Sequence, residues 1–253
     1  MPTNEAGHQT LEQVRAVLHS QARIGPAFRP DRLEIDEEGT LTIEGEVESV
    51  AAKKRALAQI AALGAVTAIV DRLHVKPAAP MGDAEIRAHL GRFFSQDPAF
   101  AGLTVRQMHH ESYDPVYEPV YEVVAEGAPE SAGHIDIEVR DGAITLNGQV
   151  PGLNSQRLAG VMAWWVPGVR DVINGLAVEP PEEDAPIRIE EAVRTALERD
   201  PYVEAGQVRV GVLHREVRLT GVVASEGLKE MAEQDAWCVL GVDNVINEIA
   251  VRP

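Results

Sequence analysis

The chain is short of the residues that several functional classes require. Its single cysteine, Cys238, excludes an intramolecular disulfide framework and a cysteine-rich zinc site. Aromatic residues make up only 4% of the sequence, which argues against a base-stacking surface for nucleic acid. The 23 basic residues are outnumbered by 40 acidic ones, and the net charge of −17 repels nucleic acid and anionic membranes. No run of 18 apolar residues occurs, so no segment is expected to cross a bilayer as a helix.

The rest of the composition is that of a folded globular protein, with 45% hydrophobic and 25% charged residues. Residues 1–10 are polar and lack the basic and then apolar profile of a secretory signal. These features predict an acidic protein located in the cytoplasm, with no nucleic-acid partner and no cofactor.

One sequence pattern occurs three times. Alternating apolar and polar residues end in Gly-x-Val at Gly45, Gly148 and Gly221, as in TLTIEGEV, AITLNGQV and EVRLTGVV. Apolar residues recur 21, 28 and 30 positions after each of these glycines, without a gap: Val66, Leu73 and Val75; Val169, Leu176 and Val178; Val242, Ile249 and Val251. A spacing kept in three copies indicates an internal structural repeat.

Hydrophobic periodicity predicts the same elements in each copy. Residues that alternate with period two indicate a hairpin of two half-buried strands before each glycine. Apolar residues at helical spacing follow it, then a last strand, and an amphipathic helix precedes each hairpin. Gly168 and Gly241 follow the second helix of their copies, where a left-handed helix end favours glycine. The third copy lacks glycine in its hairpin turn, so we expect that turn to be built differently.

Proline-rich and charged segments separate the copies. Residues 76–80 (KPAAP) and 179–186 (EPPEEDAP) have little capacity to pack and are predicted linkers. The boundaries therefore give three domains, residues 1–79, 80–181 and 182–253. The middle domain carries an insert at about 102–133, and part of this insert has strand-like content.

The closing motif of each copy resembles a known family. Residues 168–178 (GVRDVINGLAV) and 241–251 (GVDNVINEIAV) are similar to the end of the BON domain, named after bacterial osmotic-shock and nodulation proteins. The first copy departs from the motif, with Ala65 in place of glycine and Asp71 in place of asparagine. The resemblance implies an α+β fold of three tandem αββαβ domains, each a three-stranded sheet covered by two helices. It also implies an association with phospholipid surfaces, osmotic stress or potassium, and no common catalytic residues.

Few residues stand out as candidates for a site. Asn174, Asn247 and Asp71 occupy one position of the repeat, and we interpret them as turn or strand-entry residues that bond local backbone, with a polar ligand role as the alternative. The only cluster of metal-ligand types is His109, His110 and Glu111 with His134. Neighbouring residues of a strand face opposite ways, which favours a solvated loop over a metal site.

Large aromatic side chains are the remaining candidates. Trp164 and Trp237 share one position of the repeat beside the inward stripe of the helix, and Trp165 is adjacent. We interpret these residues as covering a core edge or a contact between repeats, with a membrane interface as the alternative. Tyr117 and Tyr121 in the insert are further possible apolar contacts.

No catalytic motif is present in the sequence, since it contains neither Gly-x-Ser-x-Gly nor a glycine-rich phosphate loop between strand and helix. We therefore expect a non-enzymatic binding or scaffold protein of an envelope or osmotic-stress context, with a phospholipid surface or a protein as partner. The alternatives are a sensor that binds a monovalent cation such as potassium, motivated by the charge of −17, and a protein-interaction array.

Overall fold

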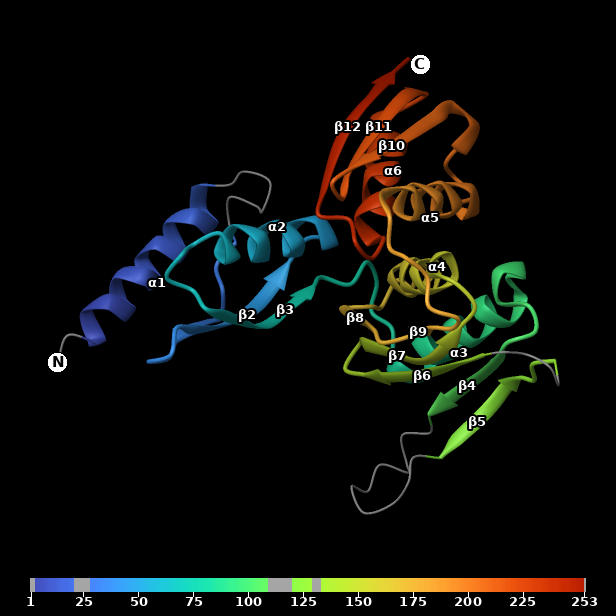
Figure 1. Cartoon of the computed structure of the whole chain (residues 1–253), viewed down its shortest axis with the longest axis horizontal. Coiled ribbons are helices and arrows are strands. Elements are labelled where there is room, and N and C mark those ends of the chain that lie inside the picture. Colours follow the sequence, from blue (N-terminus) through green and yellow to red (C-terminus); the bar gives the residue numbers. More distant parts are fainter. Residues whose placement is uncertain (1–2, 21–27, 109–119, 129–132, 253) are drawn as a thin grey trace. The chain divides into compact units, whose positions relative to one another are not determined.

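A computed structural model describes residues 3–20, 28–108, 120–128 and 133–252. The chain forms two compact units, Met1–Lys76 and Pro77–Pro253. The first unit holds the first repeat, and the second unit holds both the second and the third (Figure 1).

The first unit has the predicted order of elements. It consists of α1 (Thr3–Ser20), β1 (Arg32–Ile35), β2 (Thr40–Val47), α2 (Val50–Ala61) and β3 (Ala68–Val75). Strand β2 is central, antiparallel to β1 and parallel to β3. Because successive residues of β2 alternate between the two faces of the sheet, Leu41, Ile43 and Val47 all point to the buried side.

The second repeat has the same elements and two more strands. It consists of α3 (Asp83–Gln96), the 3₁₀ turn η1 (Pro98–Phe100), β4 (Thr104–Met108), β5 (Tyr121–Ala125), β6 (His134–Arg140), β7 (Ala143–Val150), α4 (Leu153–Trp164), β8 (Asp171–Asn174) and β9 (Ala177–Val178). The sheet order is β5-β4-β6-β7-β8, and β9 also pairs with β7. The insert thus widens the predicted three-stranded sheet, because β4 pairs in parallel with the free edge of β6.

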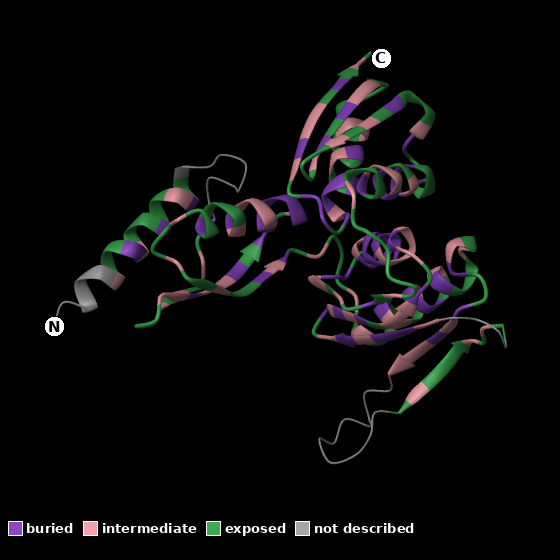
Figure 2. Cartoon of the chain, viewed as in Figure 1, coloured by how far each residue is buried: buried purple, intermediate pink, exposed green. Residues whose placement is uncertain are grey.

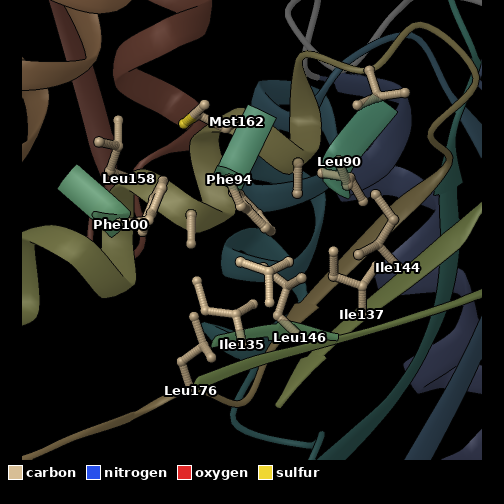
Figure 3. Close-up of a cluster of buried hydrophobic side chains, with 14 of the residues drawn as sticks. Leu90, Phe94, Phe100, Ile135, Ile137, Ile144, Leu146, Leu158, Met162 and Leu176 are labelled. Carbon is tan, nitrogen blue, oxygen red and sulfur yellow. The ribbon is translucent and has the colours of Figure 1, made fainter. Parts of the chain in front are cut away.

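The core of the second repeat lies between this sheet and helices α3 and α4 (Figure 3). Phe94 and Phe100 make an edge-to-face contact with ring centroids 5.0 Å apart. The other large side chains come from both helices and from β6 and β7: Leu90, Ile135, Ile137, Ile144, Leu146, Leu158 and Met162. Aliphatic residues therefore dominate this core, as the scarcity of aromatic residues requires.

The third repeat keeps the three-stranded sheet. It consists of α5 (Pro186–Arg199), the 3₁₀ turn η3 (Ala205–Gln207), β10 (Val208–Leu213), β11 (Glu216–Val223), α6 (Glu226–Cys238) and β12 (Asn244–Val251). Strand β11 is central, antiparallel to β10 and parallel to β12. The α+β class and the αββαβ order are thereby confirmed in all three copies.

The hairpin turn of the third repeat does not differ from that of the second, contrary to the expectation. Both turns have two residues in the left-handed region, Asp141 (φ 50°) and Gly142 (φ 77°) in one, His214 (φ 47°) and Arg215 (φ 65°) in the other. Arg215 holds its turn without glycine, since its Nε donates to the carbonyl oxygen of Gly241 at 3.0 Å.

The repeated glycines of the central strands are explained by close backbone approach. A Cβ atom at Gly148 would overlap the carbonyl oxygen of His134, and one at Gly221 would overlap that of Gln207. Both glycines also have a positive φ, 117° and 143°. Gly45, at the same position, lies against the backbone of Pro30, 3.2 Å from the place of a Cβ. Only glycine fits such a position without strain.

Helix α4 differs from its counterparts in being buried all round. Residues 157–163 are all buried, whereas α2 and α6 bury one face each (Figure 2). Its own sheet covers one side of α4, and helices α5 and α6 of the third repeat pack on the other. The second and third repeats therefore share a helical interface within the second unit.

Candidate functional site

The three polar residues at one repeat position hold a helix to a strand. Asn174 Nδ2 donates to the carbonyl oxygen of Gln156 on α4 at 2.6 Å, and Asn247 Nδ2 donates to that of Lys229 on α6 at 2.9 Å. Their Oδ1 atoms accept from backbone N–H groups two residues further on. Both side chains thus bond backbone of their own repeats, but they do so from strands, since Asn174 ends β8 and Asn247 lies within β12.

The first repeat makes the same connection with other groups. Asp71 Oδ1 accepts from the N–H of Leu73 at 2.9 Å, and its Oδ2 forms an ion pair of 3.1 Å with Lys53 on α2. The Lys53 ammonium also donates to the carbonyl oxygen of Leu73 at 2.7 Å. The amide of Gln156, at the position of Lys53, donates to Leu176 in the same way. Lys53, Asp71 and Gln156 therefore each help to join the helix of a repeat to its last strand.

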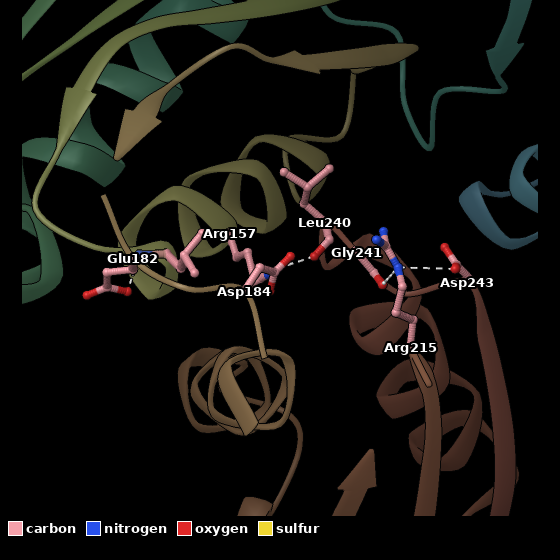
Figure 4. Close-up of polar contacts among 8 residues, drawn as sticks. Arg157, Glu182, Asp184, Arg215, Leu240, Gly241 and Asp243 are labelled. Atoms are coloured by element: carbon pink, nitrogen blue, oxygen red, sulfur yellow. Dashed lines mark hydrogen bonds and ion pairs between the residues drawn. The ribbon is translucent and has the colours of Figure 1, made fainter. Parts of the chain in front are cut away.

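Arg157 of α4 joins the second repeat to the third. Its side chain is only 2% exposed, Nε donates to the carbonyl oxygen of Leu240 at 2.9 Å, and Nη2 donates to Asp184 at 2.5 Å (Figure 4). Leu240 follows α6, and Asp184 lies in the linker before α5. Because a buried guanidinium must be paired, these contacts fix the position of the third repeat on α4.

A cleft of about 780 Å³ lies along the junction of the two repeats. Phe93 of α3 and Trp165 at the end of α4 line it from the second repeat. The third repeat contributes the residues after α5 and one face of α6: Asp200, Pro201, Tyr202, Gly227, Glu230, Met231, Glu233, Gln234 and Asp235. Its lining residues include four acids and no lysine or arginine. The adjoining hollow is lined by Arg199, which forms an ion pair of 2.9 Å with Asp97.

Asp235 is the most perturbed titratable group of this cleft. It is 3% exposed, and its Oδ1 accepts from the indole Nε1 of Trp165 at 2.8 Å. Burial raises the pKa of Asp235 to about 8; the Trp165 hydrogen bond opposes this, while the charge of Asp200 and a hydrogen bond to its carboxyl add to it. At neutral pH Asp235 is therefore mainly protonated, in a site that bridges both repeats.

The predicted aromatic residues lie in different surroundings. Trp237 is completely buried, with Nε1 3.4 Å from Glu233, and Trp164 packs against the core of the second repeat. Trp165 is half-buried and lies in the cleft. This geometry favours the interpretation as packing and contact between repeats. Tyr121 begins β5, where the Arg106 guanidinium lies 5.2 Å from its ring centroid, and burial raises its pKa.

The predicted helix-end glycines have two different roles. Gly241 has the expected left-handed conformation, with φ 93°. Gly168 does not, so the prediction of a left-handed end was wrong there. A Cβ at Gly168 would instead overlap the side chain of Met81, which makes close packing the reason for glycine.

The remaining candidates of the insert lie outside the described residues. These are His109, His110, Glu111 and Tyr117. His134 is described, with Nε2 3.7 Å from Asp136. In the part of the chain that the structure describes, no three His, Cys, Asp or Glu residues gather as a metal site would need.

The sequence interpretation missed Arg157, Asp200 and Asp235. One signal was available, since the six apolar residues from Leu158 to Ala163 indicate a helix buried on every side, and such a helix needs a second partner. A second signal is a carboxylate at Asp235, where the second repeat has Met162.

Comparison with known proteins supports the repeat pattern. The family model of the BON domain matches residues 9–77, 121–180 and 188–253. No curated protein matches the chain. Among solved structures, the C-terminal domain of CdsD, the structural protein of the type III secretion system of Chlamydia trachomatis, is 15% identical with a TM-score of 0.24, over 96% of this chain and 97% of that one. A second CdsD structure is 14% identical with a TM-score of 0.24, over 95% and 93% of the two chains.

Within the described residues, none of the helices has the length and apolar character needed to span a membrane.

Proposed function

Because the chain belongs to the BON domain family, we propose that it is a non-enzymatic binding and scaffold protein whose second and third repeats act as one rigid body. The observation that carries the proposal is the buried side chain of Arg157, which hydrogen-bonds both the linker and the loop after α6. A flexible tether between domains would leave such a group in water.

The use of the buried polar groups supports a binding role rather than catalysis. Asn174, Asn247 and the Lys53–Asp71 pair each connect a helix to a strand of the same repeat. Arg157 connects two repeats. Catalysis needs a nucleophile, a base and a stabilising group that converge on a substrate, and these side chains serve packing instead.

As part of the same proposal, the protein acts in the bacterial cytoplasm in an envelope or osmotic-stress response, at a phospholipid surface or on a partner protein. Potassium binding is the alternative that the net charge of −17 supports, because such a charge concentrates cations at the surface. The proline-rich linkers support a third role as an interaction array.

Rigid coupling of the repeats is tested by ¹⁵N relaxation of the full chain. We expect one rotational correlation time for residues 80–108, 133–178 and 188–252. Arg157→Met should give the second and third repeats separate values, and Lys54→Met, at the equivalent position of the first repeat, should not. Separate values in the unmodified chain would overturn the proposal.

The partner is tested by vesicle flotation and by potassium titration in a calorimeter, on one preparation. With a charge of −17 we expect weak flotation with anionic vesicles in the presence of a chelator, since the repulsion acts over roughly 8 Å at physiological salt. Tight flotation that replacement of Trp165 leaves unchanged would contradict the expectation and reveal another lipid surface.

A further inference from the structure

Asp235 is a buried acid at a repeat position that the first two repeats fill with uncharged side chains, Gln59 and Met162. Its neighbours on α6, Ala232 and Ala236, are fully buried. Oδ2 of Asp235 is buried and has no hydrogen-bond donor among the described residues, and Asp235 is one of the residues that line the cleft. A buried oxygen without a donor costs free energy, so an acid here without a ligand lowers stability.

The cleft combines negative charge with aromatic surface. Asp200, Glu230, Glu233 and Asp235 line it together with Phe93, Trp165 and Tyr202, and its lining holds no lysine or arginine. A volume of about 780 Å³ is that of a small-molecule site. Aromatic rings attract cations through the negative faces of their π-systems, and they are the usual site for alkylated ammonium groups.

We propose that this cleft binds a free organic ammonium ion, with the carboxyl groups of Asp200 and Asp235 supplying the charge and the three rings the apolar surface. The inference rests on the proposed function, because both repeats must be joined to form the cleft. A bare metal ion fits less well, since it requires several converging oxygen ligands and no such cluster lies within the described ranges. An ammonium ion brings its own apolar groups to the rings.

Binding of this cation is linked to the proton of Asp235. The titratable groups that line the cleft with Asp235 are Asp200 and Tyr202 after α5 and Glu230 and Glu233 on α6, and Trp165 donates to Asp235 from the second repeat. A positive charge in the cleft stabilises the carboxylate form of Asp235, so binding releases its proton. Affinity should therefore rise with pH, up to about tenfold per unit, until the pKa of about 8 is passed.

The test is calorimetric titration of the full chain with choline and benzyltrimethylammonium at pH 6, 7 and 8, in buffers of different ionisation enthalpy. The neutral carbon isostere of choline, 3,3-dimethylbutan-1-ol, serves as the ligand control. We expect binding of the cations with proton release, at least about tenfold tighter than the isostere, which lacks the charge. The indole N–H signal of Trp165 should shift on binding.

Two variants locate the site, with a third as control. Asp235→Asn keeps the shape and the acceptor for Trp165 but should lose the proton release and most of the affinity. Trp165→Phe should weaken binding and remains informative if Asp235→Asn fails to fold. Glu226→Gln makes the same acid-to-amide change at an exposed position of the same helix and should bind like the unmodified chain.

Three results would overturn the assignment. The first is equal affinity for choline and its isostere, and the second is no binding of either cation below about 10 mM. If either of these two results is found while the second and third repeats share one rotational correlation time, the ligand assignment fails and the proposed function stands. If the repeats have separate correlation times, the ligand assignment and the proposed function both fail. The third is flotation with phosphatidylcholine vesicles that Asp235→Asn abolishes, which would identify a lipid headgroup as the occupant in place of a free ligand.

Discussion

Replacing Asp235 with asparagine is expected to remove much of the pH dependence of the stability of the second unit. Asparagine imitates the protonated acid, since its Oδ1 accepts from Trp165 and its Nδ2 donates toward Asp200. The variant therefore keeps the hydrogen bonds of the neutral form, and it has no proton to lose when the pH rises.

The magnitude follows from the pKa of about 8 in the folded protein against 3.8 in the unfolded chain. Between these values the unfolded chain binds fewer protons than the folded one, so the free energy of unfolding falls as the pH rises, by about 1.4 kcal/mol per unit. The loss levels off above the folded pKa. From pH 5 to pH 8 the unmodified protein should thus lose about 4 kcal/mol relative to Asp235→Asn.

Tryptophan fluorescence during urea unfolding measures this difference in the full chain. All three tryptophans, Trp164, Trp165 and Trp237, lie in the second unit, so their signal follows that unit alone. Other groups titrate in both proteins and cancel in the comparison. Parallel stability profiles for the two proteins from pH 5 to pH 9 would refute the reasoning and show that Asp235 is ionised in the folded state.

Three further substitutions test the interfaces of the fold. Arg157→Met should lower the free energy of unfolding of the second unit by about 1–2 kcal/mol in urea titrations, because it leaves the carbonyl oxygen of Leu240 and the half-exposed carboxylate of Asp184 without their donor, whereas Lys54→Met should have a smaller effect. Gly221→Val should cost at least about 2 kcal/mol through its positive φ and backbone overlap, measured against Gly211→Val, whose added side chain meets open space; equal melting temperatures would contradict this. Asn247→Ala should lower the free energy of unfolding by about 1–2 kcal/mol and speed hydrogen exchange of the Ile249 N–H, which donates to Asn247 Oδ1. Unchanged exchange would show that this hydrogen bond does not protect the Ile249 N–H.

The repeat and its fold could be predicted from the sequence because local signals determine them. Alternating residues such as Leu41 and Ile43 fix the strands, and the spacing from Gly148 to Leu176 fixes the helix between two strands. The recurrence of glycine indicated a backbone requirement, which the overlap with neighbouring carbonyl groups explains at Gly148 and Gly221.

The cleft could not be predicted because it depends on contacts between repeats. Trp165 and Asp235 are 70 positions apart, and neither belongs to a motif. Arg157 is followed by an apolar run, and a single arginine there resembles a solvated helix residue until a second domain covers it. Periodicity describes one element at a time, whereas the hydrogen bond from Trp165 to Asp235 depends on how two folded repeats are docked.

The repeats join helix to strand with different side-chain pairs, so the effect of substituting one member of a pair should depend on which residue the other member is. The first repeat uses the charged pair Lys53 and Asp71, and the second uses the neutral pair Gln156 and Asn174. Asp71→Asn alone would leave the buried Lys53 ammonium without its counter-charge, so it should be better tolerated together with Lys53→Gln. The third repeat combines lysine with asparagine, at Lys229 and Asn247, but Lys229 is only half-buried. Exchange of segments between repeats, by recombination or by design, is therefore expected to succeed when the helix and its following strand move together.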